Sequence, residues 1–168
     1  PKQPINGVIL CISLEDIITG GPDLVAQHAE AIRARLIELH SQLKVDFPVY
    51  AVFTKADLVA GFSEFFGHLN EAGRKAVWGA TFQTDDKTDN RVGETGEEFD
   101  LLIERLNLEL IDRLQDEPTP TAKVQLLGFP SQMAASRGAI VDFLNRIFEP
   151  TRYHANATLR GFYFTSGT

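Results

Sequence analysis

Cysteine, methionine and tryptophan are scarce in this sequence, with one of each among 168 residues. A lone cysteine has no partner within the chain, so Cys11 excludes an internal disulfide and suits a reducing compartment. Cys11 stands inside an apolar run, and we expect it to be a small buried side chain and not a nucleophile. With no second cysteine, and with four histidines at no metal-ligand spacing, the sequence predicts no metal site.

Basic residues and long hydrophobic runs are also in short supply. The chain has 16 Lys and Arg against 23 Asp and Glu, a formal net charge of -7 at pH 7. Nucleic acids are bound by clustered Lys and Arg that neutralise phosphates, so this acidity argues against a nucleic-acid partner. The longest aliphatic run, Val8 to Ile12, is far shorter than the roughly 18 residues of a membrane span, and the first residues do not have the pattern of a signal peptide. We therefore expect a soluble piece without direct membrane insertion.

The residues that are present have the composition of an ordinary globular domain, with 43% hydrophobic, 23% charged and 10% aromatic side chains. A chain of 168 residues fits one domain, which buries roughly 70% of the surface that its unfolded chain exposes. The sequence begins at Pro1 without a methionine and stops directly after an expected strand, which suggests a fragment of a larger protein. We expect residues 1–168 to form a single α/β domain whose function lies partly outside it.

Apolar runs alternate with helical periodicities along the chain. Strands are expected at residues 7–13, 49–53, 123–129 and 159–165, and helices at residues 23–43, 58–70, 97–114 and 136–148. The near-continuous apolar character of residues 7–13 is typical of a strand covered on both faces. Alternating strands and helices imply right-handed crossovers, so the sequence predicts an α/β fold with a mainly parallel sheet and flanking helices. A polar stretch at about 83–96 is expected to be an exposed loop insertion.

The tetrapeptide Thr54-Lys55-Ala56-Asp57 follows the expected strand at 49–53 and resembles the Asn-Lys-x-Asp base-recognition motif of P-loop GTPases, with Thr54 in place of the Asn. Nowhere does the chain contain the Gly-x-x-x-x-Gly-Lys-Ser/Thr loop that cradles phosphates. A hydrogen bond to a charged group contributes ~1.5–3 kcal/mol, whereas micromolar affinity needs about 8 kcal/mol. We therefore interpret Thr54, Lys55 and Asp57 as the relic of a base site and expect no cofactor in this chain. In the alternative interpretation, Asp57 caps the helix at 58–70 and Lys55 is a solvated charge.

Aromatic side chains concentrate after this motif. Phe62, Phe65 and Phe66 fall at helical spacing, and Trp78 follows in the same segment of the chain. Ordinary core packing is one interpretation. The other is a partner-facing surface made by these four residues, because aromatic side chains concentrate in the energetic centres of protein interfaces. The solvent exposure of Trp78 distinguishes the two.

Three stretches together resemble one protein family. The first is Phe47 to Leu58, which contains the tetrapeptide; the second is the aromatic series Gly61 to Phe66, continuing at Val77 to Phe82; the third is Leu159 to Thr168. They resemble the cytoplasmic region of the IcmF/TssM family, the large inner-membrane component of bacterial type VI secretion systems. The second and third stretches are more specific to the family than the first.

The resemblance implies a fold like the C-terminal part of a P-loop GTPase-like domain, whose phosphate-binding half, in members that have one, precedes Gly7. It also implies a structural scaffold at the cytoplasmic face of the bacterial inner membrane, with partners among the membrane-complex and baseplate proteins of the secretion system. No catalytic residue is assigned in this chain. The alternative from another functional class is a nucleotide hydrolase, binding GTP or ATP, whose active site is completed by residues outside 1–168.

Overall fold

The computed structural model describes residues 5–74, 77–86, 89–151 and 157–166. Its strands form one sheet in the order β1-β2-β4-β3, with β1 Val8–Ser13, β2 Pro48–Thr54, β4 Thr158–Phe164 and β3 Trp78–Thr81. Strands β1, β2 and β4 are parallel neighbours, whereas β3 runs antiparallel to β4. The expected α/β class is confirmed. The sheet is mixed and not wholly parallel, because β3 adds an antiparallel edge.

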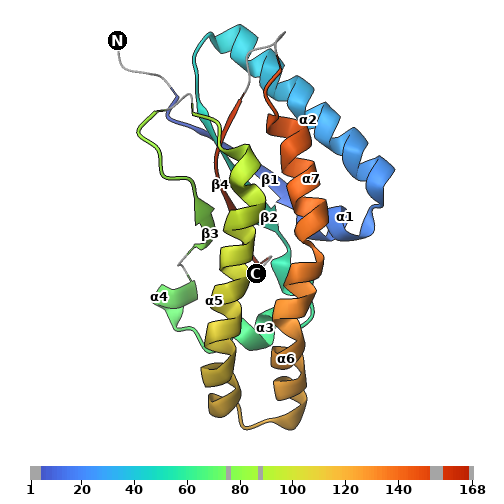
Figure 1. The fold of residues 1–168 in the computed structure, drawn as a ribbon, viewed down its shortest axis with the longest axis vertical. Coiled ribbons are helices and arrows are strands. Elements are labelled where there is room, and N and C mark those ends of the chain that lie inside the picture. Colours follow the sequence, from blue (N-terminus) through green and yellow to red (C-terminus); the bar gives the residue numbers. More distant parts are fainter. Residues whose placement is uncertain (1–4, 75–76, 87–88, 152–156, 167–168) are drawn as a thin grey trace.

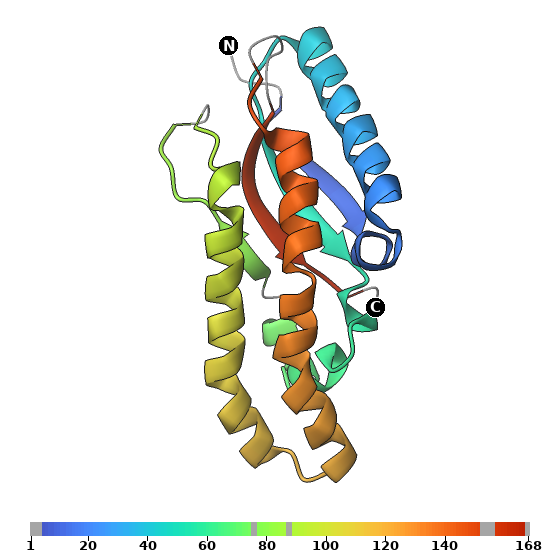
Figure 2. The same ribbon diagram turned by 45° about the vertical axis from the view of Figure 1, so that its right-hand side comes forward.

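Helices connect and cover these strands (Figure 1). They are α1 Leu14–Thr19, α2 Pro22–Leu43, α3 Phe62–Phe66, α4 Glu71–Arg74, α5 Thr95–Asp116, α6 Pro120–Ala135 and α7 Arg137–Phe148, with the 3-10 helices η1 Ala56–Leu58 and η2 Val92–Glu94. Figure 2 shows α2, α5 and α7 on one face of the sheet. Right-handed crossovers place their helices on the same face when successive strands are added in one direction, as β1, β2 and β4 are. The helices expected at 23–43, 97–114 and 136–148 are therefore confirmed as α2, α5 and α7.

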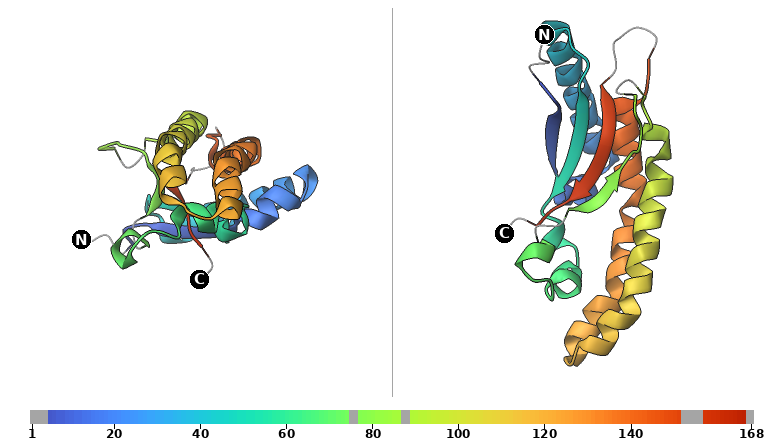
Figure 3. Two further views of the ribbon diagram at one scale, coloured as in Figure 1. Left: turned by 90° about the horizontal axis from the view of Figure 1, so that it is seen from below. Right: turned by 90° about the vertical axis from the view of Figure 1, so that its left-hand side faces the viewer.

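The opposite face of the sheet carries none of these three helices, as the right-hand view in Figure 3 shows. On β1, Ile9 is 70% exposed and Cys11 is also exposed, because both side chains point to that face. The expectation of a first strand covered on both faces, with a buried cysteine, was therefore wrong. An uninterrupted apolar sequence gives no sign of which face of an edge strand receives the helices.

Residues 123–129, expected as a strand, lie within helix α6. Pro120 occupies the first turn, where a missing N–H costs nothing, and Leu126, Phe129 and Met133 recur at helical spacing and are buried. Helix α6 passes into α7 at Ser136, whose hydroxyl donates to the Met133 carbonyl at 2.6 Å. Helices α5 and α6 form an antiparallel hairpin, hereafter the arm, that extends beyond the sheet (Figures 1 and 3).

The helix expected at 58–70 is replaced by η1 and the five-residue helix α3. Gly61 precedes α3 with φ of 90°, and a Cβ there would collide with the Gln125 carbonyl oxygen and lie 2.7 Å from Phe129 Cβ on α6. Only glycine adopts this conformation without strain and allows this close approach. Asp57 lies in the first turn of η1 and not before a helix at 58–70.

Helix α3 is held to the arm by Arg113, a buried residue of α5. Its Nε donates to the Phe65 carbonyl at 3.0 Å, and its Nη2 donates to the Glu64 carbonyl at 2.9 Å. These bonds satisfy carbonyls at the end of α3 that have no partner within so short a helix. None of the helices in the described ranges is both long enough and apolar enough to cross a membrane.

Candidate functional site

The tetrapeptide that resembles a base-recognition motif turns the chain at the end of β2. The Thr54 hydroxyl donates to the Ile12 carbonyl of β1 at 3.3 Å, and Ala56 N–H donates to the Thr165 carbonyl at 2.9 Å. Between them, Lys55 adopts the left-handed conformation with φ of 59°. A non-glycine residue in this region is uncommon, and such residues occur often at functional sites and tight turns. The tetrapeptide is therefore fixed to the ends of both neighbouring strands.

A cavity of about 390 Å³ adjoins this turn, between α1, η1 and the junction of α6 with α7. Its lining includes Glu15, Ile18, Lys55, Leu58, Gln132 and Ala139. The Lys55 ammonium lies 3.8 Å from the Glu15 carboxylate, and both side chains are about half exposed. Ion pairs of this exposure contribute little to stability, roughly 0–1 kcal/mol. The pair nevertheless means that the Lys55 ammonium already faces the Glu15 carboxylate in the lining of the cavity.

Asp57 is half-buried and does not line this cavity, although its neighbours Lys55, Leu58 and Val59 do. Base recognition requires the lysine and the aspartate to face one crevice. Of the two, Lys55 lines the cavity beside the turn and Asp57 does not. The Thr54 hydroxyl is bonded to β1. The base-site assignment of Thr54, Lys55 and Asp57 stays a prediction.

The aromatic residues that follow form one connected cluster with Phe129 of α6 and Phe164 of β4. Phe65 is fully buried, and its ring centroid lies 5.2 Å from that of Phe129. Phe62 and Phe66 are half-buried, with ring centroids 4.8 Å apart. Trp78 is half-buried and connects Phe66, at 5.5 Å, with Phe164, at 5.0 Å. These contacts are packing contacts between α3, α6 and the sheet. Because Phe65 is fully buried, the expected partner surface is reduced to Phe62, Phe66 and Trp78, and it stays a prediction.

A second cavity, of about 410 Å³, lies between strand β3 and helix α5 and was not expected from the sequence. We call it the β3–α5 groove. Gly79, Thr81 and Gln83 line its strand side, and Glu98, Leu101 and Arg105 line its helix side. Because β3 and α5 are separated by the polar stretch at 83–96, only the tertiary structure brings these residues together. The strand itself was missed because it is four residues long and contains a glycine.

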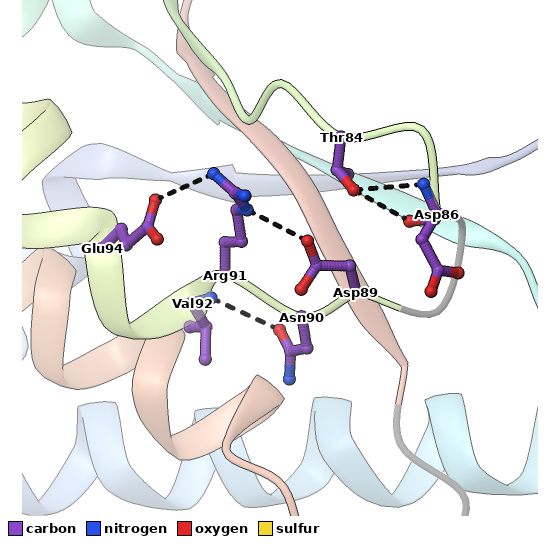
Figure 4. A network of polar contacts seen from close by, with 7 residues as sticks. All are labelled: Thr84, Asp86, Asp89, Asn90, Arg91, Val92 and Glu94. Carbon is purple, nitrogen blue, oxygen red and sulfur yellow. Dashed lines mark hydrogen bonds and ion pairs between the residues drawn. The ribbon is translucent and has the colours of Figure 1, made fainter.

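The loop between β3 and α5 contributes Arg91 and Glu94 to the lining of this groove. Figure 4 shows its polar network, in which Arg91 Nε donates to Asp89 at 3.1 Å and Arg91 Nη1 lies 3.6 Å from Glu94. The hydrogen bond that Arg91 donates to Asp89 and the charge of Glu94 raise the pKa of Arg91 above its ordinary value. Thr84 accepts from the Asp86 N–H at 3.1 Å and forms a turn. The expected loop insertion thus ends in η2 and the first turn of α5, which occupy residues 92–96.

The described residues offer no obvious catalytic or metal centre. No three histidine, cysteine, aspartate or glutamate side chains in those ranges are placed to hold a metal ion. His154, one of the four histidines of the chain, lies outside the described residues. Surfaces and grooves are therefore the features from which a function can be argued.

Comparison with known proteins gives one family and one curated relative. The model of the IcmF-related N-terminal domain matches residues 1–168. A protein of Pseudomonas aeruginosa described as type VI secretion system component TssM1 is 46% identical over 169 aligned residues, covering 99% of this chain. The chain spans 15% of the length of that relative. No solved structure matches.

Proposed function

The chain belongs to the IcmF-related N-terminal domain family, and we propose that it is a structural segment of a type VI secretion membrane complex. In this role it acts through protein contacts at the cytoplasmic face of the bacterial inner membrane and catalyses no reaction. The observation that carries the proposal is the 46% identity with TssM1 of Pseudomonas aeruginosa across nearly the whole chain. Identity at this level over 99% of the chain indicates a shared fold.

The arm supports a role in protein contacts. Near its tip, Leu108 and Ile111 on α5 are 75% and 62% exposed, and Val124 and Leu127 on α6 are 66% and 56% exposed. Large apolar side chains gathered on a projecting hairpin are typical of surfaces that other proteins cover. Helix α6 contains a single charged residue, Lys123, which leaves its exposed surface almost uncharged. Helices of this composition are usually buried.

A nucleotide-binding role is the second candidate, favoured by the left-handed Lys55 beside the 390 Å³ cavity. In this alternative, residues outside 1–168 supply the phosphate site, and the cavity receives a GTP or ATP base. The pairing of Lys55 with Glu15, and the position of Asp57 outside the lining, make the scaffold role the better supported of the two.

An exchange experiment distinguishes these roles. The matching stretch of Pseudomonas aeruginosa TssM1 is replaced by this chain, and type VI secretion by the resulting strain is measured. Two double variants follow: Leu108→Ser with Ile111→Ser on the arm, and Lys55→Ala with Asp57→Ala at the turn. Leu24→Ser is a matched control, since Leu24 is 59% exposed on α2, away from the arm.

The scaffold role predicts that secretion is retained with the unmodified chain, with the turn variant and with Leu24→Ser, and falls at least fivefold with the arm variant. The amount of full-length protein is followed by immunoblotting, so that a loss of protein is not taken for a loss of contact. Abolished secretion in the turn variant, together with an unaffected arm variant, would favour the nucleotide role and contradict the scaffold.

A further inference from the structure

We propose that the β3–α5 groove binds an extended segment of a partner protein, about five residues long, which pairs with the outer edge of β3 as a further strand. The groove offers the two parts that strand addition uses, a free sheet edge and a neighbouring helix that forms a wall. Strand β3 is last in the sheet order, and no strand of the described ranges pairs with its outer edge (Figure 1). This inference is independent of the role in secretion, because it concerns the chemistry of the groove itself.

The pairing of β3 with β4 determines which backbone groups face the groove. Phe82 N–H donates to the Arg160 carbonyl at 2.8 Å, so these two residues form a hydrogen-bonded pair. Hydrogen-bonded and non-hydrogen-bonded pairs alternate in an antiparallel ladder. Thr81 and Gly79 occupy the non-hydrogen-bonded positions and turn their N–H and C=O groups away from β4. They therefore present two donors and two acceptors to an incoming strand.

Helix α5 sets the length of the segment. The groove lining on this side runs from Glu94, just before the helix, to Arg105, eleven positions that correspond to a rise of roughly 16 Å. An extended chain covers that distance with about five residues. Leu101, 45% exposed, lies in this wall and offers an apolar contact to one side chain of the segment. Side chains of a strand alternate between two faces, so every second residue of the segment meets the wall.

Charge indicates the chemistry of the partner segment. Arg91, at the loop end of the groove, is occupied by Asp89 and Glu94. Arg105 is exposed, and no described residue forms an ion pair with it. A guanidinium that lines a groove without a carboxylate partner is suited to a bidentate pair with one. We therefore expect the segment to carry an aspartate, a glutamate or a terminal carboxylate at the end that lies near Arg105, and no carboxylate at the end near Glu98, which lines the same wall.

The edge of β3 lacks the usual protection against strand pairing. Natural sheets block their edges with lysine, proline or bulges. The strand from Trp78 to Thr81 has no charged residue and no proline, and its pairing with β4 shows no register shift. An unblocked edge that borders a groove is what a strand-binding site requires.

The test begins with a displayed library of random twelve-residue linear peptides, selected on the 168-residue chain. The most enriched peptide is synthesised with a fluorescein label, and its dissociation constant is measured by fluorescence polarisation. Amide hydrogen exchange followed by NMR then reports which backbone groups it covers. The proposal expects enriched peptides with alternating apolar residues and a carboxylate. It also expects at least tenfold slower exchange of the Gly79 and Thr81 amides on binding.

Variants at one position separate backbone pairing from side-chain contact. Thr81→Pro removes the outward N–H and leaves the ladder with β4 intact, because that N–H is not used there. Thr81→Val is the matched control, since it loses the hydroxyl that contacts Tyr163 and keeps the N–H. We expect Thr81→Pro to weaken binding at least tenfold and Thr81→Val less than threefold. Arg105→Gln is expected to weaken binding at least fivefold, and Arg35→Gln, at an exposed site on α2, to have no effect.

Three results would overturn the proposal. The first is a library that yields no enriched peptide. The second is a peptide that binds Thr81→Pro as tightly as the parent chain, with the circular dichroism of the variant unchanged. The third is a chain that forms dimers without peptide, with Thr81→Pro restoring the monomer mass, because the edge would then pair with a second copy and not with a partner segment.

Discussion

Arg137 at the start of α7 binds Asp100 on α5 through two parallel hydrogen bonds, from Nε at 2.7 Å and from Nη2 at 3.1 Å. The hydrogen bond and the charge of Asp100 raise the pKa of Arg137. The pair fastens the first half of α5 to the helix that follows the arm. Room for the guanidinium is provided by Gly96, where a Cβ would lie 2.6 Å from Arg137 Nη2.

Gly96→Ala is therefore expected to displace the guanidinium of Arg137, the end of a flexible and half-exposed side chain, and to lower the free energy of unfolding by up to about 1 kcal/mol, the worth of an exposed ion pair. Urea denaturation followed by circular dichroism measures the change. Gly128→Ala is the control within α6, where an added Cβ meets nothing within 4 Å. That variant should be more stable than the parent by about 0.5–1 kcal/mol, since alanine favours a helix interior. Equal effects of the two substitutions would contradict the packing seen at Gly96.

Gly61→Ala is predicted to be among the most damaging small substitutions in the chain. It combines a left-handed backbone with collisions against α6, so we expect a loss of about 2–4 kcal/mol in the free energy of unfolding. Gly21→Ala is a comparison without collisions, because Gly21, with φ of 74° and ψ of 158°, has no atom within 4 Å of its added Cβ. Its backbone lies in another region that is essentially limited to glycine, so the expected loss is about 1–3 kcal/mol. A Gly61 variant as stable as the Gly21 variant would argue against close contact between α3 and α6.

Arg113→Met retains an unbranched apolar stem and removes both hydrogen bonds to α3. The Glu64 carbonyl loses its donor and the Phe65 carbonyl keeps only its contact with His68 Nδ1, so the free energy of unfolding should fall by about 1–3 kcal/mol. Arg35→Met, at a side chain that is 82% exposed, should change it by less than about 0.5 kcal/mol. Thermal and urea denaturation of the two variants measure this difference, and a small effect at Arg113 would show that α3 is not held by these bonds.

Cys11 provides a chemical test of the uncovered face of the sheet. Because the thiol is exposed, we expect one thiol per chain to react with a disulfide reagent in native buffer. The rate should lie within tenfold of the rate in denaturant. Cys11→Ser, which removes the only cysteine, is the blank for this measurement. Reaction that occurs only after unfolding would mean that other parts of the same chain cover β1.

Calorimetry with GTP and with ATP tests the turn at Lys55. A single lysine and a single aspartate supply too little free energy for micromolar binding, so no measurable heat is expected from this chain. Lys55→Ala with Asp57→Ala should behave identically. Saturable micromolar binding that this double variant abolishes would instead support a functional base site.

Much of the fold could be predicted from local pattern. The parallel strands β1, β2 and β4 and the amphipathic helices α2, α5 and α7 follow from apolar runs and helical periodicity. The strand expected at residues 123–129 was wrong because a short, almost uncharged apolar run fits a strand and a buried helix equally well. The position of Pro120, and the spacing of Leu126, Phe129 and Met133, would have favoured the helix.

The candidate sites were less predictable, because they depend on contacts between distant segments. The sequence could not show that Lys55 meets Glu15, or that Asp57 lies outside the neighbouring cavity. It could not show that Phe65 is fully buried beneath α6. The β3–α5 groove depends on a strand of four residues and on a helix that begins after the polar stretch. The likeness to the C-terminal part of a GTPase-like domain stays a prediction.

The two sides of the arm differ in electrical character. Exposed residues of α5 include six carboxylates and one arginine, namely Glu97, Asp100, Glu104, Glu109, Asp112, Asp116 and Arg105, whereas α6 carries Lys123 alone. A neighbouring surface with an apolar patch beside basic groups would fit the arm better in one rotational setting than in the reverse one, although α5 also exposes Leu108 and Ile111. Turning such a neighbour by half a circle would place its cations on α6 and its apolar patch against carboxylates. The hairpin can therefore dictate the orientation of whatever assembles on it, even where the binding is weak.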